Sequence, residues 1–249
     1  MISTAQAGLL GALRRGLTIG LVLMACHGCA TVQTHDPRDP LESFNRGVFA
    51  FNEGLDQAVF KPAATIYRDV TPQLVRTGVS NFLGNLDDAW SSVNSLLQFK
   101  LRHAVDNLMR FGVNTTFGLF GVLDVASEMQ IDRHSEDFGQ TLGRWGVGSG
   151  PYLVLPMFGP STLRDAAALP VDFNGDLASQ TNDIGARNAL RVLNVIDTRA
   201  GLLGVSSALD DVALDKYSFA RDAFLQRRRN AVYDGDPPET DPVTGAEIR

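Results

Sequence analysis

The sequence predicts a compact all-α domain with several helices, preceded by a secretory signal and a short tether. Apolar residues recur every three or four positions in several segments between residues 41 and 231, as in amphipathic helices. Residues of the capping type precede proline at two of the expected helix starts. The strand signal is confined to Tyr152–Leu155, which prolines bound on both sides.

The first 25 residues have the features of a secretory signal. They contain no acidic residue, carry Arg14 and Arg15 as a positive patch, and continue in an apolar run from Leu17 to Ala25. A run this short does not span a bilayer as a permanent helix. It ends at Leu23-Met24-Ala25-Cys26, the arrangement that a bacterial lipoprotein signal peptidase recognises. We therefore predict a signal peptide over residues 1–25 and a lipid on Cys26.

A second cysteine leaves an alternative open. Gly28 precedes Cys29, but Cys26 stands three positions before it, where leucine is usual, so Cys26 is preferred as the lipidated residue. Cys26-His27-Gly28-Cys29 also has the spacing of a redox or metal pair, but it lacks the strand-to-helix context and the further ligands that such sites need. Neither cysteine is followed by aspartate, which by resemblance to Gram-negative lipoproteins favours the outer membrane, where acyl chains give a stable anchor on the periplasmic side.

Charge and composition divide the remaining chain into three parts. The full chain has 22 basic and 28 acidic residues, so removing the two arginines of the signal leaves a formal charge of 20 − 28 = −8 and disfavours nucleic acid as a partner. We expect a lipidated tether over residues 26–38, a helical domain over 39–233, and a disordered acidic, proline-rich tail over 234–249.

The first helix is expected to begin with Asp39 as its cap, Pro40 in its first position and Glu42 completing a capping box. Lys61-Pro62 is expected to end it, because proline in a helix interior removes a hydrogen bond. Its apolar residues recur at helical spacing: Leu41, Phe44, Val48, Phe51, Leu55 and Val59.

Further helices are predicted by the same spacing. Thr71-Pro72 begins a second helix with Val75, Val79, Phe82 and Leu86 on one face. Ser161 is expected to cap a helix that runs through Leu169. The other expected helices, with their apolar residues, are 101–114 (Ala104, Leu108, Phe111), 186–199 (Leu190, Leu193, Ile196) and 209–231 (Val212, Tyr217, Ala220, Phe224).

Two stretches do not read as ordinary helices of a water-soluble protein. Residues 117–126 are apolar except for Asp124, and residues 143–159 mix glycines with aromatic and aliphatic side chains. Each is too short to cross a bilayer. They are interpreted either as shallowly inserted segments or a hairpin at membrane depth, or as core segments of a bundle. In the first interpretation, residues 117–150 contain a membrane-contacting hairpin, with Gly146, Gly148 and Gly150 as hinges.

No catalytic or metal-binding constellation is found, so we predict a protein that is not an enzyme and has no cofactor and no metal. Residues 159–163 lack the second glycine of a nucleophile elbow, and residues 146–150 lack the Lys-Ser/Thr ending of a phosphate-binding loop. The histidines do not have ligand spacing. Glu136 and Asp137 are adjacent and point in different directions on a helix, which favours a solvated or capping role.

Blocks of sequence through the domain resemble a known family. They are Asp39-Pro40-Leu41-Glu42, Phe44-Asn45-Arg46, Phe49-Ala50-Phe51-Asn52, the run 75–82 with Asn85-Leu86, Asn94, Leu97-Gln98, Arg110-Phe111, Asn114-Thr115-Thr116, Gly118, Gly121, 124–126, 136–143, 145–147, 150–152, Leu155-Pro156 and 159–165. Over about residues 39–230 these blocks resemble the MlaA (VacJ) lipoprotein family. Phe99 stands where that family often has glycine, and the match thins after about residue 170 until residues 221–226.

The resemblance implies an all-helical, ring-like protein lying in the inner leaflet of the outer membrane, with a polar channel and a link to trimeric porins. Such a protein extracts phospholipids mislocalised to the outer leaflet and passes them to the soluble periplasmic lipid carrier of the Mla pathway, maintaining lipid asymmetry without making or breaking a bond. The alternative is a structural envelope lipoprotein without transport activity.

Polar residues inside the apolar helical patterns are candidates for the wall of such a channel. Buried asparagines that satisfy backbone groups would give the same pattern, so both interpretations are open at this point. The candidates are Asn45, Arg46, Asn52, Asn81, Asn85, Asn94 and Asn114.

Overall fold

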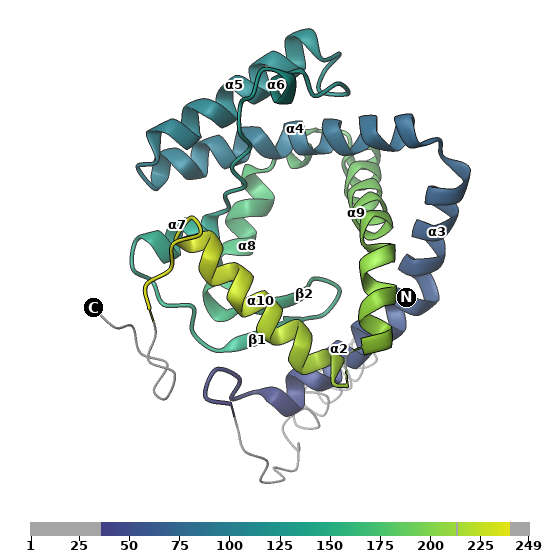
Figure 1. Ribbon diagram of the computed structural model, residues 1–249, viewed down its shortest axis with the longest axis vertical. Helices are drawn as coiled ribbons and strands as arrows, with labels where there is room; N and C mark the ends of the chain where they lie inside the picture. Colours follow the sequence, from purple (N-terminus) through teal and green to yellow (C-terminus); the bar gives the residue numbers. More distant parts are fainter. Residues whose placement is uncertain (1–35, 213, 240–249) are drawn as a thin grey trace, which may run out of the picture.

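The computed structural model of the chain describes residues 36–212 and 214–239. The predicted signal peptide, Cys26, Cys29, most of the tether and the end of the acidic tail lie outside the described residues. Within them the protein is helical, with one pair of short strands, and its helices are arranged as a ring (Figure 1). The predicted all-α, ring-like fold class is confirmed.

The chain passes around the ring, and its last helices then return along the elements that precede them (Figure 1). The elements in order are α2 (Glu42–Leu55), the π-helical turn η1 (Asp56–Phe60), α3 (Lys61–Val70), α4 (Gln73–Leu97), α5 (Leu101–Phe117), α6 (Val125–Glu128), α7 (Phe138–Arg144), β1 (Tyr152–Leu155), β2 (Gly159–Thr162), α8 (Leu163–Gly175), the 3₁₀ turn η2 (Leu177–Gln180), α9 (Ile184–Val212) and α10 (Lys216–Val232).

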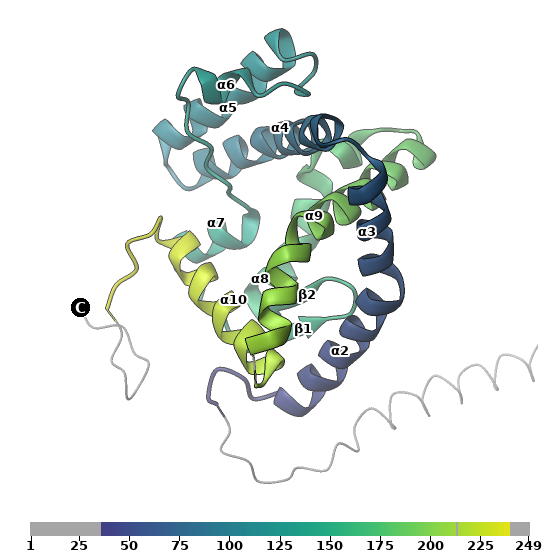
Figure 2. The same ribbon diagram turned by 45° about the vertical axis from the view of Figure 1, so that its right-hand side comes forward.

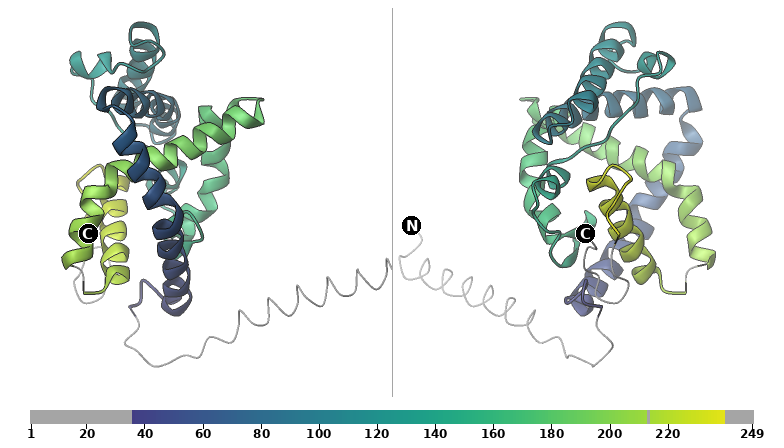
Figure 3. Two further views of the ribbon diagram at one scale, coloured as in Figure 1. Left: turned by 90° about the vertical axis from the view of Figure 1, so that its right-hand side faces the viewer. Right: turned by 60° about the vertical axis from the view of Figure 1, so that its left-hand side comes forward.

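The helices α4, α5 and α6 form one end of the molecule, as the turned views show (Figures 2 and 3). The long helix α4 packs against α5 on one side and touches α9, α7 and η2 on the other. The helix α9 also packs along α3, and α10 contacts α7 and β2. The helix α4 therefore connects the projecting end to the rest of the ring.

The prediction that Lys61-Pro62 ends the first helix is wrong. The helix passes from α2 through η1 into α3, with Pro62 near the start of α3. The backbone N–H of Lys61 donates to the carbonyl of Asp56, five residues earlier, which is π-helical spacing. This wider turn accommodates a residue without an N–H and keeps its ring clear of the preceding carbonyl, so the chain bends without stopping.

Three of the predicted helix caps are corrected. Thr71 does not cap α4, which follows Pro72 without a side-chain cap. The helix α2 begins at Glu42 after Leu41 and has no side-chain cap. Asp39 is fully buried, and its carboxylate accepts a hydrogen bond from the side chain of Asn45 at 2.8 Å instead. At the start of α8 the cap is Thr162, the last residue of β2, which accepts from the N–H of Asp165 at 3.2 Å, and Ser161 lies one residue too early to cap the helix.

The predicted strand Tyr152–Leu155 is confirmed, and it has a partner that the sequence analysis missed. The strands β1 and β2 pair antiparallel, with Tyr152 opposite Thr162 and Leu155 opposite Gly159. Pro160 concealed β2, because proline is rare in strands. In a two-stranded sheet both strands are edges, so the missing N–H of Pro160 removes little.

The remaining helix boundaries agree in part. The helices beginning near residues 72 and 101 are confirmed, as is a capping role for Asp137, which accepts from the N–H of Gln140 at 2.8 Å. The predicted helix boundaries 186–199 and 209–231 are wrong. The helix α9 extends unbroken to Val212, and α10 begins only at Lys216, capped by Asp215.

The apolar core is small and divided. One cluster joins Ala64 of α3 to Ala200 and Leu203 of α9, with Tyr67 against it. A second joins Tyr152 and Val154 of β1 to Tyr217 of α10. Among the described residues no helix is both long enough and apolar enough to cross a membrane.

Candidate functional site

The distribution of polarity in this protein is inverted relative to a water-soluble domain. Among the described residues, nineteen buried side chains are polar or charged and eleven are apolar, while many large apolar side chains are exposed. Soluble proteins seldom bury charged residues and seldom expose large contiguous apolar surface. An exterior of this kind fits an apolar environment better than water.

The helices α4 and α5 show this inversion most clearly. The buried face of α5 consists of Ala104, Asn107, Arg110 and Asn114, at helical spacing. Large apolar residues of the same helix point outward, among them Leu101, Leu108 and Phe117, which is 71% exposed. The buried face of α4 includes Asn85, Asp88, Ser91, Asn94 and Ser95. The two helices thus pack polar face to polar face.

Arg110 lies at the centre of the contact between α4 and α5, and it is 2% exposed. Its guanidinium donates to both oxygens of Asp124 at 2.8 and 2.9 Å, to the carbonyl of Ile131 at 2.5 Å, and to Asp88 at 3.4 Å. Asp88 also pairs with Arg133 at 2.8 Å. The network connects α4, α5 and the loop on either side of α6.

The two carboxyl groups around Arg110 differ in their pKa. Burial raises the pKa of Asp88, against the lowering effect of Arg133 and Arg110. Burial also acts on Asp124, but hydrogen bonds from Ser127, Asn114 and Arg110 outweigh it and lower its pKa to about 2. Asp124 is therefore ionised at neutral pH and holds the arginine as an ion pair.

Apolar side chains occupy the tips of turns where polar residues or glycine are usual. Phe99 (φ 60°), Leu119 (φ 53°), Phe120 (φ 60°) and Met157 (φ 67°) have left-handed backbone conformations, and all are at least 66% exposed. Left-handed geometry in bulky residues costs about 1 kcal/mol or more. Because these strained positions expose apolar side chains, we infer that the side chains face an apolar medium, which stabilises them better than water does.

The turn after α5 depends on a glycine. Gly121 has φ of 95°, and a Cβ at this position would lie 2.7 Å from the side chain of Asn85. The close approach lets Asn85 reach the hydroxyl of Thr115 at 3.0 Å. The apolar stretch 117–123 is therefore held as a compact tip on a polar base, with Phe120 76% exposed, and it does not form a buried core segment.

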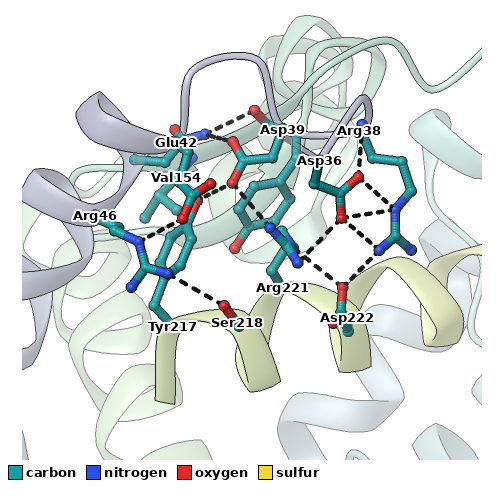
Figure 4. A network of polar contacts seen from close by, with 12 residues as sticks. Asp36, Arg38, Asp39, Glu42, Arg46, Val154, Tyr217, Ser218, Arg221 and Asp222 are labelled. Atoms are coloured by element: carbon teal, nitrogen blue, oxygen red, sulfur yellow. Dashed lines mark hydrogen bonds and ion pairs between the residues drawn. The ribbon is translucent and has the colours of Figure 1, made fainter. Parts of the chain in front are cut away.

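A second polar network fastens the start of the domain to α10 (Figure 4). Asp36 accepts hydrogen bonds from Arg38 and forms an ion pair with Arg221 at 3.1 Å. Arg221 forms a second ion pair with Asp222, also at 3.1 Å. The hydrogen bond from Arg38 lowers the pKa of Asp36 to about 2. Buried Asp39 lies 3.5 Å from Arg221 and accepts a hydrogen bond from the hydroxyl of Tyr217. The point where the tether meets the ring is thus rigidly held.

The candidate residue Arg46 belongs to this second network. It pairs with Glu42 and with Asp215, each at 2.7 Å, and its guanidinium lies 4.4 Å from the ring centre of Tyr217. The bond to Arg46 holds the pKa of Asp215 well below its usual range. Arg46 keeps 42% of its side chain exposed.

The six candidate asparagines form structural hydrogen bonds, since the side-chain N–H of each donates to a backbone carbonyl or to another polar side chain. Asn45 receives the N–H of Val154 in addition. Whether any of them also lines a channel stays a prediction. The acceptors are the Asp39 carboxylate and the Tyr152 carbonyl for Asn45, the Leu155 carbonyl for Asn52, the Val122 carbonyl for Asn81, the Thr115 hydroxyl for Asn85, the Trp90 carbonyl for Asn94 and the Asp124 carboxylate for Asn114.

The three candidate hinge glycines lie together in the segment between α7 and β1. Gly146 and Gly150 have left-handed φ values of 92° and 66°. A Cβ on Gly146 or Gly148 would meet nothing within 4 Å, whereas one on Gly150 would lie 3.1 Å from Leu163. Gly150 is thus a packed turn, and the hinge role of the set stays a prediction.

A cavity of about 200 Å³ lies between α2, η1, α9 and α10. Two ion pairs cross it: Arg199 binds both oxygens of Asp56 at 2.7 Å, and Lys216 lies 3.1 Å from Glu53. Sequence reasoning missed these residues, because the partners are 143 and 163 positions apart. The local signal in the sequence is Pro62, which follows the π-helical turn that contains Asp56.

The structure also brings together histidines that are far apart in sequence. The rings of His103 and His134 stack with centres 3.7 Å apart, and His103 forms a group with Glu136 and Asp234. Lys100 lies 2.8 Å from Glu136 and 2.5 Å from Asp234, so its ammonium forms an ion pair with each of the two carboxylates. The group is therefore explained as an ion-pair cluster.

Comparisons with known proteins agree on one family. The family described as MlaA lipoprotein matches residues 37–231. The chain is 38% identical over 218 residues to the intermembrane phospholipid transport system lipoprotein MlaA of Escherichia coli strain K12, covering 85% of each. It is 34% identical over 229 residues to the lipoprotein of the same name from Haemophilus influenzae, covering 88% of this chain and 90% of that one.

A solved structure shares the fold. It comes from work on the structural basis for maintenance of bacterial outer membrane lipid asymmetry. It matches with a TM-score of 0.70 and 36% identity, over 78% of this chain and 98% of the other.

Replacing Arg110 by methionine should strongly destabilise the fold. The substitution leaves Asp124 and Asp88 in the interior without their shared cation, so we expect the free energy of unfolding to fall by about 3–5 kcal/mol in urea titrations followed by circular dichroism. Arg68→Met is the control, because Arg68 pairs on the surface with Asp69 and its loss should cost under about 1 kcal/mol. Equal costs for the two variants would contradict the central role of Arg110.

Replacing Phe99 by glycine should stabilise the protein and weaken its attachment to lipid vesicles. Glycine relieves the left-handed backbone, raising the free energy of unfolding by roughly 0.5–1 kcal/mol, while an exposed phenyl ring is lost. Stability is measured by denaturant titration and vesicle attachment by flotation with lipid vesicles. Cys26 and Cys29 are replaced by alanine in every variant, so that acyl chains do not determine the attachment. Gln130→Gly is the matched control, since Gln130 (φ 57°) has the same strain without an apolar side chain. Equal flotation of the two variants would refute a lipid contact at Phe99.

Proposed function

The chain belongs to the MlaA lipoprotein family, and on this premise we propose that it transports phospholipids between membranes as a lipoprotein of the outer membrane. In this proposal it removes phospholipids mislocalised to the outer leaflet through a polar channel and so maintains lipid asymmetry. The observation that carries the proposal is the inverted polarity of the ring, with polar networks inside and apolar side chains outside.

The inverted polarity suits the movement of a lipid with a charged headgroup. Such a headgroup crosses hydrocarbon only at a high cost, because its hydration is lost. A path lined with polar groups replaces that hydration while the acyl chains remain in the apolar surroundings of the ring. Side chains at the end formed by α4 and α5, such as Leu74 at 87% exposure and Phe99 at 86%, would contact those surroundings.

The channel candidates divide into two roles in this proposal. Arg46, whose side chain is 42% exposed, can meet a headgroup directly. The four buried asparagines Asn45, Asn85, Asn94 and Asn114 would hold the wall in shape through their hydrogen bonds. Asn52 and Asn81 fix the loops that follow β1 and α5.

The predicted lipid on Cys26 would keep the ring at the periplasmic side of the outer membrane. An extended chain advances at most about 3.5 Å per residue, so the ten steps from Cys26 to Asp36 reach no more than about 35 Å. Because Asp36 is held to α10 through Arg221, the anchor and the ring would stay within that distance. Segment 117–150, with Gly146 and Gly148 as its open glycines, would form the mobile membrane contact.

The proposal also names partners and excludes catalysis. Trimeric porins would hold the ring in the outer membrane, and a periplasmic lipid carrier of the Mla pathway would receive the phospholipid. Transfer of an intact lipid breaks no bond, so the protein would act without a catalytic residue, cofactor or metal. A lipid-modifying enzyme would instead release a product from labelled phospholipid.

Deleting the gene should raise the phospholipid content of the outer leaflet, measured by enzymatic palmitoylation of lipid A. The unaltered chain should restore the low level, Cys29→Ala should do the same, and Cys26→Ala should not. Restoration by Cys26→Ala but not by Cys29→Ala would move the anchor to Cys29. An unchanged outer leaflet after deletion would contradict transport and favour a structural envelope role.

A further inference from the structure

A second cavity, of about 280 Å³, lies where the first turns of α4 approach α9. The two helices converge there in the ring (Figure 1). It is lined by Gln73, Arg76, Thr77 and Ser80 of α4 and by Asp197, Ala200 and Gly201 of α9. The lining thus combines one cation, one anion and several neutral hydrogen-bonding groups, next to two small residues.

Arg76 brings an unsatisfied donor to this cavity. Its Nε is buried and has no hydrogen-bond partner, and no ion pair of Arg76 is found in the described part of the chain. Guanidinium groups bind carboxylates and phosphates through paired N–H donors, and a buried donor without an acceptor is costly. Buried Arg110 and half-buried Arg228 have carboxylate partners, whereas half-buried Arg76 has none among the described residues. The Nε of Arg187 is also without a partner, but Arg187 does not line this cavity. The unsatisfied donor of Arg76 at the cavity wall points to an anionic ligand.

Asp197 is held in a fixed orientation on the opposite wall. Its two oxygens accept hydrogen bonds from the hydroxyl of Tyr67 at 2.9 Å and from that of Ser80 at 2.6 Å. Burial, together with this carboxylate, raises the pKa of Tyr67 to about 12, so the phenol remains a donor. A carboxylate has about four acceptor positions, so Asp197 can still receive hydrogen bonds from a cation.

We propose that this cavity binds the headgroup of a zwitterionic phospholipid, with the phosphate on Arg76 and the ammonium on Asp197. Gln73 and Thr77 supply further donors to the phosphate. The inference rests on the proposed function. It adds which residues bind the headgroup and which kind of headgroup they favour. The first cavity is a weaker candidate, because the cations Arg199 and Lys216 are already bound to carboxylates.

The pairing of one cation with one anion predicts a preference among phospholipids. Every phospholipid has the phosphate that Arg76 binds. An ethanolamine headgroup also offers an ammonium to Asp197, whereas a glycerol headgroup leaves that carboxylate next to the phosphate without a counter-charge. Phosphatidylethanolamine should therefore bind more tightly than phosphatidylglycerol.

Gly201 provides a way to fill the cavity without disturbing the fold. A Cβ at Gly201 meets nothing within 4 Å, so Gly201→Leu extends a side chain into open space from the middle of α9. Gly204, one turn further on, has the same freedom but does not line the cavity, so Gly204→Leu is the matched control. Both substitutions replace a helical glycine by a better helix former.

The test is calorimetric titration of the purified full chain in detergent. The ligands are dihexanoyl phosphatidylethanolamine, dihexanoyl phosphatidylglycerol and inorganic phosphate. We expect Arg76→Gln to weaken the binding of both lipids at least tenfold, and Asp197→Asn to weaken only the ethanolamine lipid by a similar factor. Gly201→Leu should abolish binding, and Gly204→Leu should bind as the unaltered chain does.

Several results would overturn the headgroup site. The first is unchanged lipid binding by Gly201→Leu or Arg76→Gln. The second is equal affinity for the two lipids with no effect of Asp197→Asn. The third is binding of inorganic phosphate as tight as that of lipid, which would indicate a site for free anions. Outer-leaflet phospholipid in cells separates this inference from the proposed function. Full restoration of asymmetry by Gly201→Leu would refute the site alone, whereas no restoration by the unaltered chain would refute transport.

Discussion

The fold depends on hydrogen bonds and ion pairs buried between helices, in places where soluble proteins use apolar packing. Arg110 connects α4, α5 and the loop around α6, and the Asp36–Arg221 network attaches the start of the domain to α10. Buried ion pairs hold a structure only when all of their hydrogen bonds are satisfied, because desolvation is expensive. Asn114 and Ser127 complete the set around Asp124, and Tyr217 and Asn45 complete that around Asp39.

This internal polarity leaves the apolar side chains for the exterior. Because α4 and α5 face each other mainly with asparagine, serine and charged residues, many of their leucines, valines and phenylalanines point outward, and Leu83 is the one large apolar side chain of these two described helices that is buried. The same constraint explains the left-handed turn tips at Phe99 and Phe120, which present aromatic rings that water would not stabilise. A ring with these two surfaces provides acyl chains with an apolar contact and headgroups with a polar one.

Helical periodicity predicted most of the helices, because it depends on local geometry that the sequence carries directly. Periodicity identifies an apolar face, but it does not reveal what that face contacts, so the outward direction of Phe44 and Phe51 was not predictable. Pro62 was misread because a π-helical turn accommodates it, and β2 was missed because Pro160 lies within it. Arg76 and Asp197 lie 121 positions apart, so only the folded chain brings them to one cavity.

The central claim is that the outward apolar surface of α4, α5 and the tip 117–123 that follows α5 lies among acyl chains. The most direct measurement places a single tryptophan at Phe120, in a chain whose Trp90 and Trp145 are replaced by phenylalanine, and follows its quenching by brominated phospholipids in vesicles. The account predicts strong quenching at Phe120 and weak quenching for a tryptophan at the exposed polar position Arg68. Equal, weak quenching at both positions would show that the surface lies in water and would contradict the account.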